Sequence, residues 1–258
     1  MRFFLELTFK GTRYAGWQRQ SNALTVQEET ENSLSLILRE PVKLTGCGRT
    51  DTGVHARQFY THFDCPRVPT DYQLRRVNRV LPYDISIVRC WPVPDHAHAR
   101  FDAFKRTYEY NICRYKDPFR EDTVFRFPHI DQVDVHLVVQ ISELIKQYKE
   151  FYPFSKSRTD VSHYACEIFD SDWDIGNNLW TYRISANRFL RGMVRLIVGL
   201  SLNAGVGKLS IDLVKESLET QTRIPGIWSV PARGLFLTAV EYPLNVIDAG
   251  AHREENLP

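Results

Sequence analysis

The sequence predicts an α+β fold in which a central, mainly antiparallel sheet is flanked by helices. Two observations predict it: the segment order β-α-β-β-α-β within residues 1–100, and the same order again within residues 101–244. The composition agrees, because 43% of the 258 residues are apolar and 25% are charged, as in packed globular proteins. We therefore expect an N-terminal lobe at 1–100, a C-terminal lobe at 101–244 and a polar tail at 245–258.

The first half carries strand-like and helix-like periodicities in a definite order. The expected elements are the strand Phe3–Phe9, the helix Val26–Arg39, the strands Val42–Thr45 and Val54–Phe63, the helix Asp71–Val80 and the strand Ile85–Trp91. Thr25 and Glu28 form a capping-box pattern at the start of the first helix, and Pro82 stops the second. This order is that of the ferredoxin-like unit, which RRM-like RNA-binding domains also use, with helices on one face of an antiparallel sheet.

The second half repeats the order with one additional helix. The expected elements are the strand Thr107–Arg114, the helix Val133–Lys149, the strands His163–Asp170 and Leu179–Ala186, the helices Arg188–Ala204 and Ser210–Glu219, and the strand Leu235–Tyr242. No residue-level repeat accompanies this pattern. The prediction of two units therefore rests on the order of the elements alone.

Composition excludes several classes of protein. Lys and Arg number 33 against 31 Asp and Glu, so the net charge of +2 does not by itself indicate a nucleic-acid partner. Five cysteines without a CxxC pair argue against a disulfide framework and a zinc knuckle, and His96 and His98 have no third ligand nearby, so no metal is expected. No apolar segment resembles a membrane span or a secretory signal, which favours the cytoplasm.

The stretch Gly46–His55 is the densest cluster of unusual sequence. It holds three glycines, and its one carboxylate, Asp51, stands between Thr50 and Thr52. A hairpin turn in which Asp51 bonds its own backbone is one explanation. The other is a nucleophile or base on a loop between strands, kept ionised by Arg49 two residues away.

Two further stretches combine basic and aromatic residues. On the expected helix at 188–204, Arg188, Arg191 and Arg195 fall within about 60° of one another, which suits phosphates or a functional carboxylate, although a solvated face would look the same. Residues 100–110 interleave basic and aromatic side chains, as RNA-binding surfaces do, and strand alternation places Tyr108 and Tyr110 on one side. Ordinary sheet aromatics would give the same alternation. A basic track on the helix Asp71–Val80 either extends this surface or keeps the helix soluble; it comprises Arg75, Arg76 and Arg79.

The Gly48–Ala56 segment resembles the signature GRTD(A/T)GVHA of the TruA family of tRNA pseudouridine synthases. Six other stretches resemble motifs of that family in the same order. They are residues 11–20 (GTxYxGWQxQ), 81–85 (LPxDI), 98–101 (HARF), 106–110 (RxYxY), 189–199 (FLxxMVRxIVG) and 234–235 (GL). Together they extend over nearly the whole chain, which makes chance agreement implausible.

The resemblance implies the pseudouridine synthase fold and a homodimer that isomerises uridine in the anticodon arm of tRNA, at tRNA positions 38–40, without a cofactor or metal. Asp51 would be the nucleophile, Tyr108 would stack on the flipped base and help to move the C5 proton, and Arg195 would pair with Asp51. Arg49 would assist base flipping. Further substrate contacts are expected from Thr50, His55, Arg100, Arg188 and Arg191. Whether Asp51 attacks C1′, adds to C6 or removes the C2′ proton stays open.

The chain departs from the family pattern at Lys10, Gly192 and Cys166, where many members have aspartate, a bulkier residue and arginine. Peripheral contacts of this kind affect RNA affinity and the choice of uridine. Two other functions remain alternatives. One is a non-catalytic RNA-binding module, although the third strand lacks the RNP1 pattern. The other is a carboxylate-dependent hydrolase or nuclease, for which a second acid close to Asp51 would be expected.

Overall fold

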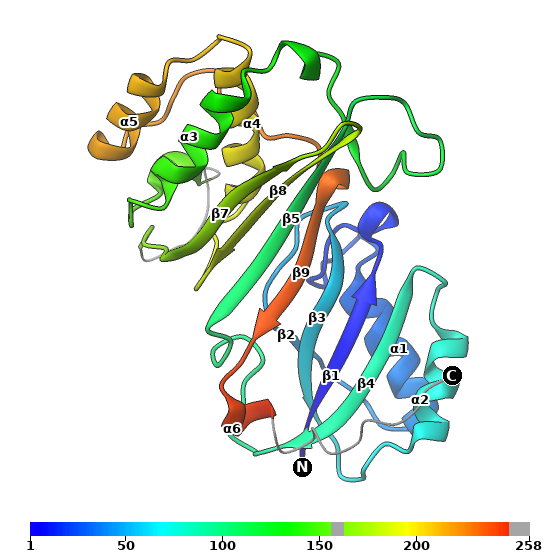
Figure 1. Ribbon diagram of the computed structural model, residues 1–258. Coiled ribbons are helices and arrows are strands. Elements are labelled where there is room, and N and C mark those ends of the chain that lie inside the picture. The colour runs from blue at the N-terminus through cyan, green and yellow to red at the C-terminus, as the bar shows by residue number, and fades with distance from the viewer. Residues whose placement is uncertain (156–162, 248–258) are drawn as a thin grey trace. The chain divides into compact units, whose positions relative to one another are not determined.

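The computed structural model describes residues 1–155 and 163–247 and forms two compact units (Figure 1). Unit 1 comprises Met1–Lys105 together with the chain from Leu237 onwards, and unit 2 comprises Arg106–Phe236. The last strand, Leu235–Glu241 (β9), therefore begins in unit 2 and continues in unit 1. Both units are mixed helix and sheet, which confirms the predicted fold class.

Unit 1 is built on an antiparallel sheet. Its central strand Arg2–Phe9 (β1) pairs with His55–Asp64 (β3) on one side and Ile85–Val93 (β4) on the other. The short strand Thr45–Gly46 (β2) pairs with β3, and β9 is also a neighbour of β3. The helices Val26–Leu38 (α1) and Asp71–Val80 (α2) contact each other and lie on one face of this sheet (Figure 1).

The helix boundaries in unit 1 follow from their caps. The predicted bounds of α2 are confirmed, and Thr70 and Gln73 form a complete capping box at its start. At α1, the Thr25 hydroxyl accepts from the backbone N–H of Glu28 over 3.3 Å, while the Glu28 carboxylate pairs with Arg19. Arg39 adopts a left-handed conformation with φ of 58°, which ends this helix at Leu38.

The strand predicted at Val42–Thr45 is wrong, because only Thr45 and Gly46 pair as a strand. The backbone before them is satisfied by side chains of α1. The N–H of Leu44 donates to the Glu31 carboxylate over 2.9 Å, and its carbonyl accepts from the Gln27 amide over 2.9 Å. With both groups satisfied in this way, the segment has no need of a strand partner.

Aromatic side chains fill the core between the sheet and the helices of unit 1. Phe3, Phe59 and Trp17 are buried, and the ring centroids of Trp17 and Phe59 lie 4.3 Å apart. A side chain on Gly46 would collide with the Trp17 indole and the Phe59 ring. The tryptophan therefore fixes the strand end that leads into the loop at residues 47–54.

His62 on β3 is a buried histidine of unit 1. It is 6% exposed, and its Nδ1 accepts a hydrogen bond of 3.0 Å from the backbone N–H of Ala99. Burial, assisted by the nearby His98 and Arg2, lowers the pKa of His62 to about 4. The fold thus requires the neutral ring, because a protonated Nδ1 cannot accept this bond.

We predict that unit 1 loses stability as the pH falls from 6.5, the ordinary pKa of the side chain, to about 4. In that range the unfolded chain binds a proton at His62 that the folded chain does not bind, so acid favours unfolding. The full loss is about 3 kcal/mol. Urea unfolding followed by tryptophan fluorescence across this range measures it.

His62→Asn provides the control, because an asparagine keeps an acceptor near the position of Nδ1 and does not titrate. Burial also lowers the pKa of His98, and that contribution remains in both proteins. The free energy of unfolding of the variant should therefore fall less than that of the parent chain. Equal losses in the two proteins would count against the prediction.

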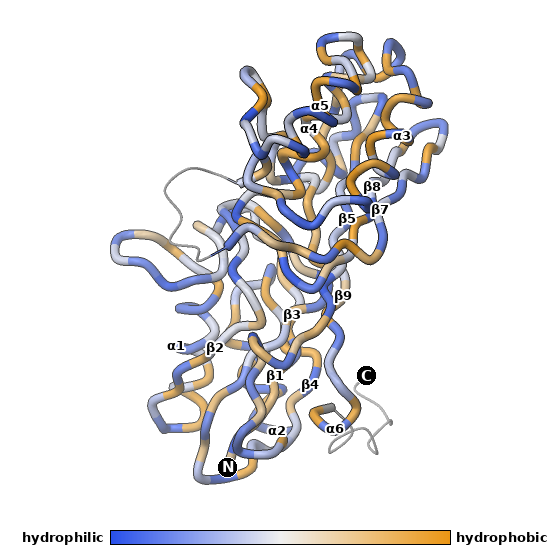
Figure 2. Tube along the Cα trace, turned by 90° about the vertical axis from the view of Figure 1, so that its left-hand side faces the viewer, coloured by the Kyte–Doolittle hydropathy of each residue, from blue (hydrophilic) through white to orange (hydrophobic). Residues whose placement is uncertain are grey.

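The strands of unit 2 are mainly antiparallel and are covered by helices. Its strands are Lys105–Cys113 (β5), Leu179–Ala186 (β8) and Ile168–Ile175 (β7), in that spatial order, and Phe125–Arg126 (β6) pairs in parallel with β5. The helices are Val135–Ile145 (α3), Met193–Gly205 (α4) and Ile211–Thr220 (α5). Helix α3 contacts β7, α4 and α5. Hydrophobic and hydrophilic residues alternate along it (Figure 2), as in a helix with one buried face.

Three elements predicted in unit 2 differ from the structure by more than two residues at one end or at both. The strand expected at His163–Asp170 begins only at Ile168, because residues 163–167 pair with the chain after α3: the N–H of Phe151 donates to Tyr164 and that of Cys166 donates to Lys149. The helix expected at Val133–Lys149 is shortened to α3, whose first turn is capped by Asp134.

The helix expected at Arg188–Ala204 starts only at Met193. Gly192 has a φ of 74°, a left-handed conformation that is incompatible with a continuing helix. Arg188 and Arg191 therefore precede the helix, and the predicted stripe of three arginines on one helix face is wrong. Arg195 alone of the three lies on α4.

Helix α4 is the most buried helix of unit 2. A side chain at Gly199 would overlap the backbone carbonyl of Trp228, so a glycine allows the segment at 228–231 to lie directly on the helix. The Trp228 indole donates to the Asn203 side chain over 3.1 Å, and the N–H of Val230 donates to the carbonyl of Arg195 over 3.2 Å. These contacts fix the backbone around Arg195.

The described part of the chain ends with a short helix, Leu244–Ile247 (α6), which overlaps the start of the polar tail expected at 245–258; residues 248–258 lie outside the described residues. All five cysteines are free, and four of them are buried. Among the described helices, none combines the length and hydropathy that a membrane span needs.

Candidate active site

The loop that joins β2 to β3 presents Asp51 on unit 1. The N–H of Cys47 donates to the carbonyl of Tyr60 over 2.7 Å where the loop begins, and the N–H of Val54 donates to the carbonyl of Asp51 over 3.1 Å where it ends. Asp51 is half-buried and Arg49 is exposed. The carboxylate thus lies on a short loop whose start is tied to β3 and whose end is closed by a hydrogen bond within the loop.

A second segment, residues 11–16, supports this loop through its backbone. The N–H of Gly53 donates to the carbonyl of Tyr14 over 3.2 Å. A side chain on Gly16, whose φ is 92°, would overlap the carbonyl oxygen of Thr50, and one on Gly11 would overlap that of Val54. Two glycines are therefore required here because two backbones meet without space between them.

His55 and Thr50 are both buried, in contrast to Arg49. His55 is 0% exposed, and its Nδ1 accepts from the backbone N–H of Gly11 over 3.0 Å, so that it joins β3 to the supporting segment. The Thr50 hydroxyl is buried without a hydrogen-bond partner among the described residues. His55 therefore supports the loop, whereas the Thr50 hydroxyl makes no hydrogen bond within the described residues.

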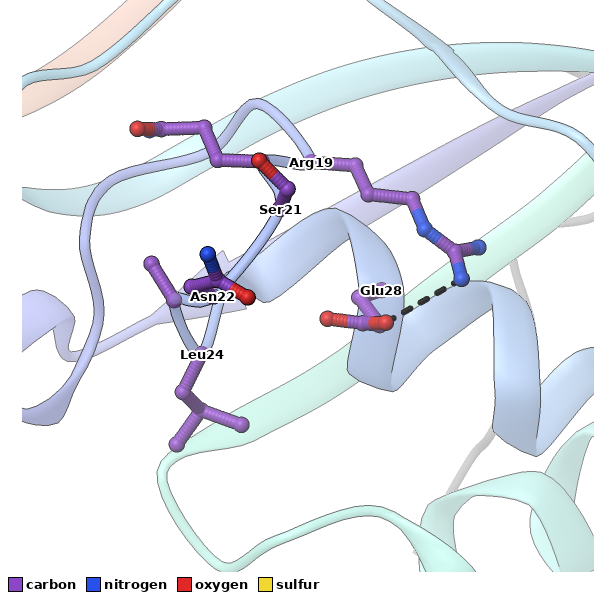
Figure 3. A pocket seen from close by; sticks show the side chains of 7 residues that line it. Arg19, Ser21, Asn22, Leu24 and Glu28 are labelled. Atoms are coloured by element: carbon purple, nitrogen blue, oxygen red, sulfur yellow. Dashed lines mark ion pairs between the residues drawn. The ribbon is translucent and has the colours of Figure 1, made fainter.

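The residues that follow the supporting segment form a polar network with α1. The Gln27 side chain accepts from the amide of Gln18 over 2.8 Å and from the N–H of Arg19 over 2.9 Å. Beside it, Arg19, Ser21, Asn22, Leu24 and Glu28 line a surface hollow (Figure 3). The Arg19 guanidinium pairs with Glu28 over 3.1 Å and with Glu31 over 3.3 Å, so its positive charge is compensated by carboxylates of α1.

On unit 2, the strand β5 carries Tyr108 and Tyr110, and their environments differ. The Tyr108 ring is half-buried and meets the Phe189 ring edge to face, with centroids 5.1 Å apart. Tyr110 is fully buried, and its hydroxyl donates to the carbonyl of Pro231 over 2.7 Å. Tyr110 is thus a core residue, whereas part of Tyr108 remains accessible. The sequence marks Phe189 only as the first residue of the FLxxMVRxIVG stretch and does not place it beside Tyr108.

The three arginines of the FLxxMVR stretch also have different environments. Arg195 is half-buried on the first turn of α4, and its Nε donates to the carbonyl of Val230 over 2.7 Å. Arg188 lies before the helix and contacts the His163 ring over 2.8 Å, while Arg191 is exposed. The hydrogen bond at Nε therefore restricts the orientation of the Arg195 guanidinium relative to α4.

Four further arginines named from the sequence are exposed on unit 1. Arg100 lies over the Phe101 ring, 5.7 Å from its centroid, in a turn where the Nδ1 of His98 accepts from the N–H groups of residues 100 and 101. The other three lie on the outer face of α2; they are Arg75, Arg76 and Arg79. Their exposure suits phosphate contact.

No group of three or more His, Cys, Asp or Glu side chains in the described part of the chain is arranged to hold a metal ion.

Comparison with known proteins identifies the family. A tRNA pseudouridine synthase family profile matches residues 148–243. The chain is 40% identical over 244 residues to tRNA pseudouridine synthase A of Parabacteroides distasonis, covering 94% of this chain and 96% of that protein. It is 42% identical over 247 residues to the protein of the same name from Porphyromonas gingivalis, covering 94% and 97%. The corresponding protein of Chlorobaculum tepidum is 35% identical over 240 residues, covering 92% of this chain and 96% of that protein.

These relatives cover both units, including the Asp51 loop and the strand with Tyr108. The chain belongs to the TruA family of tRNA pseudouridine synthases.

Proposed function

We propose that this chain isomerises uridine to pseudouridine in the anticodon arm of tRNA, with Asp51 as the nucleophile and with the target base flipped out of its stack. The observation that carries the proposal is the Asp51 loop. It contains the GRTD signature, it is supported by a second backbone through Gly11 and Gly16, and it occurs in a chain 40% identical to a tRNA pseudouridine synthase A.

The reaction needs a charged nucleophile and no redox partner. The C1′–N1 bond of uridine breaks, the base turns, a C1′–C5 bond forms, a proton leaves C5 and a proton is gained at N1. Substrate and product contain the same atoms, so the reaction consumes no second substrate, and the family resemblance implies that it uses no cofactor. Asp51 acts in this sequence at C1′, at C6 or on the C2′ proton.

In this proposal Tyr108 and Arg195 of unit 2 act on the same nucleotide as Asp51. The accessible part of the Tyr108 ring stacks on the flipped base, and its hydroxyl helps to move the C5 proton. Arg195 pairs with the Asp51 carboxylate and keeps it ionised while an apolar base covers it. The Nε of Arg195 donates to the carbonyl of Val230, and we assign the ion pair with Asp51 to its Nη groups.

The remaining assignments concern RNA binding. Arg49 assists base flipping, and Thr50, Arg100, Arg188 and Arg191 contact the RNA. We assign His55 to loop support, because it is fully buried. The enzyme is also proposed to work in the cytoplasm and to form a homodimer. Light scattering on the purified chain tests the homodimer directly.

Release of tritium from tRNA labelled at C5 of uridine tests the function, because isomerisation exchanges that hydrogen. We expect tritium release from a tRNA with uridines at positions 38–40, with the strand intact and without free uracil. A tRNA that lacks those uridines is the matched control and should release no tritium.

Two other outcomes would identify the alternatives. Tight tRNA binding without tritium release would favour a non-catalytic RNA-binding module. Free uracil or a cleaved strand would favour a hydrolase or nuclease. Tritium release from both tRNAs at equal rates would leave the isomerase standing and contradict the anticodon-arm assignment.

A further inference from the structure

Asp84 is a buried carboxylate that the reaction proposed above does not use. It lies between α2 and β4 and is 8% exposed. The Arg13 guanidinium donates to both of its oxygens, from Nε over 2.7 Å and from Nη2 over 3.1 Å. The hydroxyl of Tyr14, a residue 1% exposed, donates to the same carboxylate over 2.6 Å.

These contacts fix the supporting segment from two sides. The side chain of Asp84 holds Arg13 and Tyr14, and its backbone carbonyl accepts from the N–H of Lys10 over 2.9 Å. The guanidinium of Arg13 also lies over the exposed Tyr83 ring, 5.0 Å from its centroid. One short connection between a helix and a strand therefore anchors the chain from Lys10 to Tyr14.

The supporting segment in turn holds the loop that carries Asp51. The carbonyl of Tyr14 accepts from the N–H of Gly53, two residues after Asp51, over 3.2 Å. The N–H of Gly11 donates to His55 at the start of β3 over 3.0 Å. A continuous path of hydrogen bonds thus leads from Asp84 through Tyr14 to the end of the Asp51 loop.

The strength of this path depends on the charge of Asp84. Burial opposes ionisation, but the hydrogen bonds from Arg13 and Tyr14 hold the pKa of Asp84 below its usual value. A bidentate pair with arginine has a fixed geometry and is stronger than a neutral hydrogen bond. An amide at this position would accept fewer bonds and would leave a buried donor poorly satisfied.

We propose that Asp84 is a positioning residue that fixes the orientation of Asp51 through Tyr14 and Gly53. The inference rests on the proposed function, in which Asp51 is the nucleophile. Asp84 is buried and touches no substrate in this assignment. Its loss should therefore lower the rate of the chemical step and leave tRNA affinity unchanged, because the arginines assigned to the RNA are not altered.

The test compares Asp84→Asn and Tyr14→Phe with the parent chain. At saturating tRNA, each variant should show kcat lowered about 10- to 100-fold, with the Kd for tRNA unchanged. The double variant should be little slower than the slower single variant, because both substitutions break one connection. A lower kcat with an unchanged Kd distinguishes a positioning role from a general loss of folding, because unfolding would also impair tRNA binding.

Tyr182→Phe is the matched control, because Tyr182 is 0% exposed and its hydroxyl pairs with Ser171 over 2.7 Å within unit 2. This variant loses a buried hydroxyl, as Tyr14→Phe does, and its kcat should stay near that of the parent chain. If Asp84→Asn does not fold, Tyr14→Phe carries the test by itself.

Two results would overturn the inference: parental kcat in both Asp84→Asn and Tyr14→Phe, or an equal fall of kcat in Tyr182→Phe at equal thermal stability. Asp51→Ala separates this failure from failure of the proposed function. If Asp51→Ala is active, the nucleophile assignment is wrong. If it is inactive while Asp84→Asn is fully active, only the positioning role is wrong.

Discussion

Replacing Asp51 with asparagine or alanine is expected to lower pseudouridine formation by at least about 1,000-fold. The substitution removes the carboxylate that the proposed reaction requires at the sugar or the base. Asp51 is half-buried on a loop fixed by backbone hydrogen bonds from Gly53 and Val54, and neither bond involves its side chain. The loop should therefore persist in both variants.

Tritium release from labelled tRNA measures the rate, and filter binding measures tRNA affinity. Thermal unfolding of each variant is the control for folding. We expect near-parental stability and affinity, because one loop side chain is lost from a large RNA interface. Turnover close to the parental rate in Asp51→Asn would refute the assignment of the nucleophile.

Gly16→Ala is expected to produce the second largest effect, on both stability and activity. The residue has a φ of 92°, and an added Cβ would overlap the carbonyl oxygen of Thr50, next to Asp51. Conformational strain and overpacking together should cost about 2–5 kcal/mol. Because the collision is with the backbone of the Asp51 loop, relief of the collision displaces the nucleophile, and kcat should fall about 100-fold.

Gly207→Ala separates strain from collision. Gly207 has a φ of 76°, and a Cβ there would meet nothing within 4 Å, so this variant pays the conformational cost alone. Thermal unfolding should show a smaller loss of stability than in Gly16→Ala, and kcat should stay near the parental value. Equal effects of the two substitutions would mean that the contact with Thr50 has no special role.

Local signals in the sequence were sufficient where an element is closed by its own caps. The bounds of α2 follow from Thr70 at its start and Pro82 after its end, and both signals act within one turn of the helix. The start of α1 follows from Thr25 in the same way. Neither boundary depends on partners that are distant in the sequence.

Local signals failed where distant residues satisfy the backbone. The segment at 42–44 reads as a strand, yet Gln27 and Glu31 of α1 occupy the hydrogen-bonding groups of Leu44. The segment at 163–167 also reads as a strand continuous with β7, but Cys166 and Tyr164 bond to Lys149 and Phe151. At α4 the helical periodicity extends through Gly192, whose left-handed conformation breaks it.

The sequence by itself determined the family, the order of the elements and the identity of the loop carboxylate, since motif residues and periodicities are read directly from neighbouring positions. Only the tertiary structure decided which of the named residues are accessible. Arg49 is exposed whereas His55 is buried, and Tyr108 remains partly accessible whereas Tyr110 lies in the core. It also revealed the path from Asp84 through Tyr14 to Gly53. Burial and hydrogen bonding arise from residues far apart along the chain, and a linear pattern does not specify which of these meet.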